Sequence, residues 1–319
     1  MMAPRPILDE MPLHIKQKIY GELDFISRCN FRKSCSANRR VSTNCELFTE
    51  CLDLQVKDDC IEWKLDQEEF SNVWVIYHEH ALGCRIETNI DSLWMDDQIV
   101  EGINFLDLAL ADFGAIIRNK ELIADSFRVE VHPEALGLLE TIKGLLSSLG
   151  HKLHVCVFEL RFEGEHEVVE SFIPFLKPEI LKAIFFWNCG RERNPLDLDR
   201  YLEMDQLKSV EVLESSRFRT NARMEKWWHI PHVSLEMREL SADSSRTLIT
   251  HFVETRSVTY MCLNCEEMDV EEVKRRLDPN FIVDTRYPSV LRYKLSDPYE
   301  EMKVTIERYF IQLTKLLIS

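Results

Sequence analysis

The feature that most constrains the fold is a strand-like segment that recurs at regular intervals. Short apolar segments with the alternation of strands are centred near residues 129, 155, 184, 210, 234, 260 and 292. Helical patterns such as "EHEVVESFIPFL" and "SRTLITHFVE" lie between them. Most of these intervals fall in the range of leucine-rich repeats. We therefore expect parallel strands stacked side by side, with each helix returning over one face.

The repeat prediction concerns the period and not a motif. The leucine and asparagine ladder of a typical leucine-rich repeat is absent. The regular spacing of the strands alone favours a leucine-rich-repeat-like solenoid. An ordinary α/β sheet with the same alternation is the alternative. The expected class is α/β, or α+β when the whole chain is considered.

The chain before the repeats divides into two segments. Residues 9–45 have helical spacing, and residues 46–96 contain four runs with a period of two, which predict a small antiparallel β meander or linker region. The repeat domain is expected over 97–319, beginning with a helical pattern at 99–119. A chain of 319 residues is long enough to bury a core without a metal or a disulfide.

The first helical segment has an apolar side with no obvious cover. Ile15, Ile19 and Leu23 recur at helical spacing, and Pro12 suits a first helical turn. Phe31 and Cys35 continue the apolar side through a second helix. A unit of about 30 residues is below the size that supports its own core, so a partner helix or the chain's own meander must cover it.

Charge and composition exclude several classes of protein. The formal net charge of −16 disfavours nucleic acid as a general partner. A basic run from Arg28 to Arg40 interrupts this acidic chain and reads either as a solvated face or as a docking surface for an acidic protein. No signal peptide and no membrane-spanning run are recognised, so we expect an intracellular protein, in the cytoplasm or nucleus, with reduced cysteines.

The sequence lacks the usual motifs of catalysis. The spacing of its nine glycines excludes the dinucleotide and phosphate loops, and no G-x-S-x-G elbow occurs. His78 and His80 share a strand face but lack a third ligand, and Cys262 and Cys265 lack a second pair, so no metal or cofactor is predicted. We expect Cys262 to lie in the core.

Two adjacent tryptophans, Trp227 and Trp228, lie in a loop between repeats. They cannot easily both be buried, so one of them is expected to face outward as a contact anchor for a substrate. The alternative is that both tryptophans cover repeat edges.

The opening residues resemble an F-box. Met11–Pro12, the isoleucines and Leu23, and "FRKSC" are similar to that family's Leu-Pro start, helical apolar spacing and terminal Cys. His14 stands where an acid is usual, and Ser34 replaces the usual Val. The remainder resembles the FTH-type domain that follows the F-box in nematode proteins, most clearly in "FIPFLKPEILKAIFFWNC" (172–189).

The resemblance implies a non-enzymatic substrate receptor of a Skp–cullin–F-box ubiquitin ligase. In this interpretation the Skp adaptor, and through it a cullin, binds the side formed by Pro12, Ile15, Ile19, Leu23, Phe31 and Cys35. A protein target then binds the repeat domain. The alternative of a different class is an interaction scaffold whose helices only cap the solenoid, and a third is a metal-dependent enzyme at His78 and His80.

Overall fold

The chain folds as two compact units with mixed α/β structure. The computed structural model describes residues 11–23, 25–42, 45–67, 72–163, 166–220, 222–277, 282–283, 287, 289–295 and 300–317. One unit contains the described residues up to Phe158 together with Val168–Ile180, and the other contains Glu159–Glu167 and those from Leu181 onward. Each unit is described by itself below. No helix in the described part of the chain is long and apolar enough to cross a membrane.

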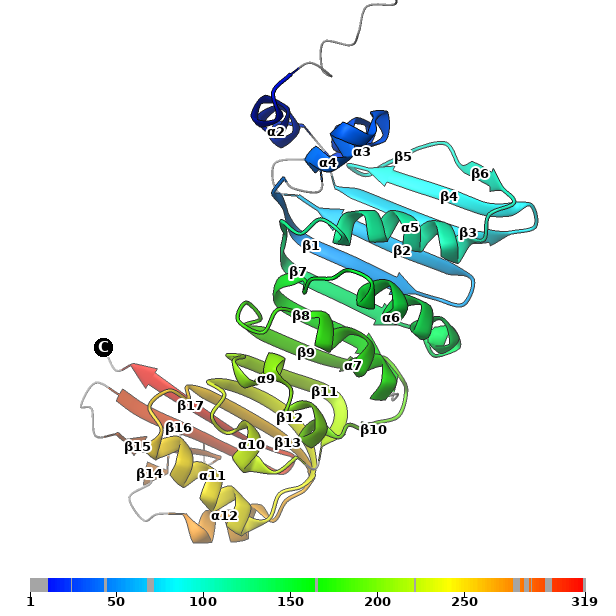
Figure 1. Cartoon of the computed structure of the whole chain (residues 1–319). Coiled ribbons are helices and arrows are strands. Elements are labelled where there is room, and N and C mark those ends of the chain that lie inside the picture. Colours follow the sequence, from blue (N-terminus) through cyan, green and yellow to red (C-terminus); the bar gives the residue numbers. More distant parts are fainter. Residues whose placement is uncertain are drawn as a thin grey trace, which may run out of the picture. The chain divides into compact units, whose positions relative to one another are not determined.

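The first unit opens with three short helices and an antiparallel meander (Figure 1). The helices are α2 (Leu13–Gly21), α3 (Phe25–Ser34) and α4 (Ser36–Ser42). The strands β1 (Leu47–Val56), β2 (Cys60–Asp66), β3 (Val73–His80) and β4 (Gly83–Ile90) pair in sequence order. The short strands β5 (Leu93–Trp94) and β6 (Gln98–Glu101) both pair with β4. The prediction of an antiparallel meander is confirmed.

The meander continues directly into the strand–helix part of the first unit. Strand β1 also pairs in parallel with β7 (Leu122–Val131), after a crossover through α5 (Phe105–Ile117). A 3₁₀ turn (Pro133–Leu138), α6 (Leu139–Ser147) and a second 3₁₀ turn (Ile173–Phe175) belong to the same unit, whereas β8 (His154–Phe162) and α7 (His166–Phe172) have residues in both units. The segments 46–96 and 97–319 therefore both contribute strands to one compact unit.

Helix α5 begins later than the predicted start at residue 99. Gln98–Glu101 forms β6 against β4, and the Asn104 side chain then accepts a hydrogen bond of 2.8 Å from the Leu106 amide. This N-cap satisfies one of the free amides of the first turn. Ile103, predicted to lie on the apolar side, is 41% exposed because it precedes the helix.

In the second unit, parallel strands follow one another in sequence order. β9 (Ala183–Asn188), β11 (Val212–Thr220), β12 (His232–Glu239) and β13 (Tyr260–Glu267) each pair with the next. The connections carry β10 (Asn194–Pro195), α8 (Leu198–Tyr201), α9 (Asp205–Lys208), α10 (Met224–Trp227) and α11 (Ala242–Glu254). Figure 1 shows α10 and α11 on the same face of these strands. The predicted strand near Val210 begins slightly later, at Val212.

The end of the chain departs from the predicted repeat. Helix α12 (Val270–Arg276) is followed by β14 (Ile282–Val283), β15 (Val290–Lys294), β16 (Glu300–Glu307) and β17 (Phe310–Leu317), which pair antiparallel. β17 then pairs antiparallel with β13. The strand near Arg292 is therefore not a parallel repeat strand. The β16–β17 connection is too short for the crossover helix that parallel pairing requires.

Candidate functional site

The N-terminal helices α2, α3 and α4 form the candidate adaptor site. Pro12 has an extended conformation (φ −57°, ψ 147°) and directly precedes α2. Its carbonyl accepts hydrogen bonds from the amides of Ile15 (3.0 Å) and Lys16 (3.1 Å). Because proline lacks an N–H and has a fixed φ, it starts the helix without leaving a donor unpaired.

Arg28 closes the carboxyl end of α2. Its Nε donates to the Leu23 carbonyl and its Nη2 donates to the Gly21 carbonyl, each at 2.7 Å. The guanidinium also lies 5.3 Å from the centroid of the Tyr20 ring. A cation at this end satisfies carbonyls that have no partner within the helix and complements the helix dipole. Arg28 is only 6% exposed, so this residue of the basic run does not belong to an exposed surface, whereas Lys33, Arg39 and Arg40 are exposed.

A small core joins the three helices. Tyr20, Val41 and Cys45 form a buried cluster, and the partly buried Phe31 packs against it. The Tyr20 and Phe31 rings meet edge to face, with centroids 5.6 Å apart. Such a pair adds about 0.5–1.5 kcal/mol to the area that it buries. The helical unit therefore holds its own shape in part, although it is too small for a large core.

The junction between α3 and α4 uses the residue that departs from the F-box pattern. The Ser34 hydroxyl donates to the Phe31 carbonyl (2.6 Å) and accepts from Asn38 Nδ2 (2.9 Å). The Asn38 amide donates to Cys35 Sγ at 3.4 Å, which gives α4 a weak sulfur cap. Ser34 thus ties two helices together, a role that valine cannot take.

The residues predicted to bind the adaptor are only partly covered by the chain itself. Pro12 is exposed, and the other five, Ile15, Ile19, Leu23, Phe31 and Cys35, are half-buried. The neighbouring Leu13 is 61% exposed. The described helices therefore leave part of this apolar side uncovered.

The side of α2 that packs within the chain differs from the side expected to bind the adaptor. Lys16 and Tyr20 are its buried residues, and one helical turn separates them. Ile15 and Ile19 therefore lie beside the inward face rather than at its centre. Tyr20 was missed because the isoleucine spacing alone defined the predicted side. The contacts of Tyr20 with Arg28 and Phe31 cross the junction from α2 to the next helix, α3, so local spacing does not reveal them.

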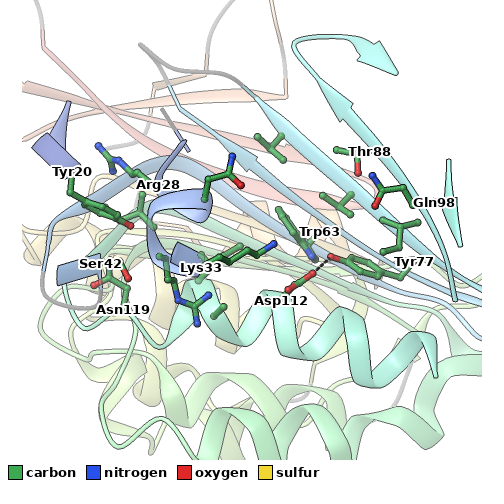
Figure 2. Close-up of a pocket in the computed structure, with 18 residues that line it drawn as sticks. Tyr20, Arg28, Lys33, Ser42, Trp63, Tyr77, Thr88, Gln98, Asp112 and Asn119 are labelled. Carbon is green, nitrogen blue, oxygen red and sulfur yellow. Dashed lines mark hydrogen bonds between the residues drawn. The ribbon is translucent and has the colours of Figure 1, made fainter. Parts of the chain in front are cut away.

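A cavity of about 280 Å³ lies beside α3 (Figure 2). Its lining combines residues of the three helices with residues of β1–β4, β6 and α5. Three lining residues are basic, namely Arg28, Arg32 and Lys33, and one, Asp112, is acidic. In Figure 2, Lys33 extends from α3 toward Trp63 and Tyr77.

The floor of this cavity is aromatic and hydrogen-bonded. The Tyr77 hydroxyl of β3 donates to Asp112 Oδ2 of α5 at 2.8 Å, and both Tyr77 and Trp63 are buried. Burial, followed by the Asp112 charge, raises the pKa of Tyr77, while a hydrogen bond with Trp63 opposes the shift. Tyr77 therefore remains a neutral hydrogen-bond donor at physiological pH.

The two adjacent tryptophans of the second unit have different environments. Trp227 is fully buried, whereas Trp228 is partly exposed. The Trp228 ring stacks on His251 of α11, with centroids 4.2 Å apart and planes 13° apart. His251 Nε2 also lies 3.2 Å from the Trp228 carbonyl oxygen. Trp228 thus faces outward as a rigid aromatic surface, while Trp227 packs in the core.

A shallow groove lies next to Trp228. It has a volume of about 430 Å³, and α11 supplies the rest of the lining: Asp243, Arg246, Thr247, Thr250, His251 and Glu254. This lining is polar and carries both signs of charge around one aromatic pair. Protein interfaces commonly combine an aromatic side chain of fixed orientation with polar residues around it.

The residues considered for a metal do not form a centre. His78 Nε2 lies 3.2 Å from Glu87 Oε1, and His80 Nδ1 accepts from the Leu82 amide at 3.2 Å. Within the described ranges, no group of three or more His, Cys, Asp or Glu side chains could hold a metal ion.

The expected core position of Cys262 is wrong. Cys265 is buried, whereas Cys262 is only half-buried. Residues three apart on a strand point to opposite faces, and β13 turns Cys265 toward the core.

Comparison with known proteins identifies the second part of the chain. Residues 137–280 match the family model of the FTH domain. This part of the chain is thus an FTH domain, and the prediction made from the 172–189 segment is confirmed.

A distant relative extends the comparison to nearly the whole chain. The protein is 20% identical over 299 residues to "F-box A protein 224" of Caenorhabditis elegans, which covers 91% of this chain and 75% of the relative. The chain is a distant homologue of an F-box A protein.

Proposed function

We propose that this protein is the substrate receptor of a Skp–cullin–F-box ubiquitin ligase. The helices within 9–45 would bind the Skp-type adaptor, and the strand–helix domain would bind a protein target. One observation carries this proposal: a small helical unit keeps an incompletely covered apolar strip, in a chain that is homologous over 91% of its length to an F-box A protein. The FTH domain behind it agrees with this arrangement.

The adaptor contact is proposed on the uncovered strip. Ile15 and Ile19 of α2 supply its centre, Pro12 lies at its exposed end, and Leu23 follows at the other. Phe31 packs against the small core of the helices, and Cys35 Sγ accepts a hydrogen bond from the Asn38 amide. We therefore expect these two residues to contribute less to the adaptor contact than Ile15 and Ile19. Burying a half-exposed isoleucine against an adaptor helix contributes about 1–2 kcal/mol.

The target surface is proposed on the repeats, which we interpret as a leucine-rich-repeat-like solenoid. Consecutive parallel strands β9, β11, β12 and β13 give a rigid and extended support. Trp228, held by its stack on His251 of α11, supplies a partly exposed aromatic anchor. Trp227 is fully buried and is therefore dropped from the proposed contact.

This role assigns no catalytic step to the chain. The ligase's other subunits transfer ubiquitin, so no acid, base, nucleophile or cofactor is needed here. Such a receptor would act in the cytoplasm or the nucleus.

The second candidate is an interaction scaffold without a ligase role. Its support is that α3 lines a cavity together with β2, β3 and β4, so the helices already contact the meander. In that case the helical unit caps the sheet, and no adaptor is required.

A pull-down of the intact chain with the Skp-type adaptor distinguishes the two candidates. Ile19→Asp and Leu23→Asp each place an unpaired charge in the proposed contact, which costs several kcal/mol, so both should abolish binding. His14→Asp is the matched control, because His14 is exposed on the same helix and the F-box pattern has an acid there. The receptor function is supported if the adaptor retains the unmodified chain and His14→Asp but neither Ile19→Asp nor Leu23→Asp. Absence of retention by an intact chain that melts cooperatively favours the scaffold.

A further inference from the structure

The cavity beside α3 has a charge pattern that the proposed function does not use. The protein carries a formal net charge of −16, yet three of the four charged residues that line this cavity are basic. Arg28 is committed to the carbonyls at the end of α2. Arg32 and Lys33 are thus the basic residues available to a ligand in the cavity.

Arg32 has an unsatisfied donor at this site. Its Nε is buried and has no hydrogen-bond partner among the residues that the structure describes. A buried guanidinium N–H without an acceptor is costly, and a negatively charged oxygen is the acceptor that compensates it best. Lys33 on the same helix adds a second, exposed cation that extends toward Trp63 and Tyr77 (Figure 2).

The single acid of the lining does not cancel this charge. Asp112 accepts the Tyr77 hydroxyl at 2.8 Å and belongs to the floor of the cavity. The rest of the lining combines apolar and aromatic side chains, among them Trp63, Tyr77 and Ile116, with the uncharged polar side chains of Asn30, Ser42, Thr88, Gln98 and Asn119. A ligand that matches both the basic and the aromatic lining residues of the cavity has an anionic group and an apolar ring.

We propose that this cavity binds a small organic anion with an aromatic body. The anionic group pairs with Arg32 and Lys33, and the ring lies against Trp63 and Tyr77. The volume of about 280 Å³ suits a small molecule rather than a protein segment. Because the ligand would touch both α3 and the meander, it would fix the N-terminal helices to the sheet. The inference does not depend on adaptor binding.

Titration with two fluorescent probes tests this proposal on the full chain. Anilinonaphthalenesulfonate carries the ring and the anion, and its neutral parent phenylnaphthylamine carries the ring alone. We expect saturable binding of the sulfonate. Arg32→Gln and Lys33→Gln should each weaken it by about three- to ten-fold, because each removes one charge-assisted contact. The neutral parent should bind all of these proteins equally.

Two further variants separate the cavity from general hydrophobic binding. Arg39→Gln removes an exposed charge from α4 outside the lining and should leave both probes unaffected. Ala115→Leu fills the cavity from α5 with a good helix former and should weaken both probes. A cooperative melt verifies the fold of each variant.

The proposal is overturned by any of three results. These are no saturable sulfonate binding by the intact chain, equal sulfonate affinity in Arg32→Gln, Lys33→Gln and the unmodified protein, or undiminished binding of both probes to Ala115→Leu.

Discussion

At the scale of single residues, the buried carboxyl group of Asp53 makes the free energy of unfolding depend on pH. Asp53 of β1 is 8% exposed and faces Arg128 of β7, with 3.3 Å between Oδ2 and Nη1. Burial nevertheless outweighs Arg128 and raises the Asp53 pKa above its ordinary value of 3.8. The folded protein therefore binds this proton more tightly than the unfolded chain, and the contribution of Asp53 to stability is lost as pH rises through the raised pKa.

We predict that Asp53→Asn changes the slope of stability against pH. Relative to this variant, the unmodified protein should gain unfolding free energy as pH falls from 7 toward 4, because the buried carboxylate becomes neutral. Urea unfolding at a series of pH values measures the difference. Asp58→Asn, at an exposed position in the β1–β2 turn, should show no comparable trend. The prediction is contradicted if the unfolding free energy of the unmodified protein, minus that of Asp53→Asn, stays constant or falls as pH decreases.

At the scale of elements, the N-terminal helices depend on one side chain. Arg28 donates two hydrogen bonds to the last carbonyls of α2 and covers the Tyr20 ring. Lysine keeps the charge but lacks the planar fork that makes both bonds. The geometry of α2 relative to α3, and with it the proposed adaptor strip, therefore depends on the guanidinium group and not on charge alone.

We predict that Arg28→Lys weakens α2 by about 1–3 kcal/mol, the value of hydrogen bonds from a charged donor. Amide hydrogen exchange should become about ten-fold faster or more at the carboxyl end of α2. The exchange of the strands β1–β4 should stay unchanged. Arg40→Lys, which is exposed on α4, is the matched control. Equal protection of α2 in both variants would show that the Arg28 fork does not hold the helix.

Element types were predictable where a local period decides them. The alternation in 47–90 predicted an antiparallel meander, and the spacing near Ile184, Ser234 and Tyr260 predicted strands that the structure contains. The antiparallel strands β16 and β17 were missed because the prediction followed a strand–helix period, and a tight hairpin has no helix.

The site was less predictable than the elements, because contacts between elements create it. The adjacent tryptophans left open whether one faces outward or both cover repeat edges, and only the structure distinguishes the buried Trp227 from the partly exposed Trp228. The inward side of α2 follows from Tyr20 and Arg28, which meet across a helix junction. The cavity combines lining residues from many elements, so no local pattern indicates it.

At the scale of the whole molecule, we propose that one chain combines a segment that binds an adaptor with a domain that binds a target. The FTH domain occupies residues 137–280, and the distant F-box A relative aligns with 91% of the chain. The central claim is that this chain joins a ligase through an adaptor.

Size-exclusion chromatography of the intact chain with purified adaptor and cullin tests this claim most directly. We predict that the chain co-elutes with the cullin only when the adaptor is present, and that Ile19→Asp removes it from the complex while His14→Asp does not. Elution of an adaptor–cullin complex without the folded, intact chain would contradict the account.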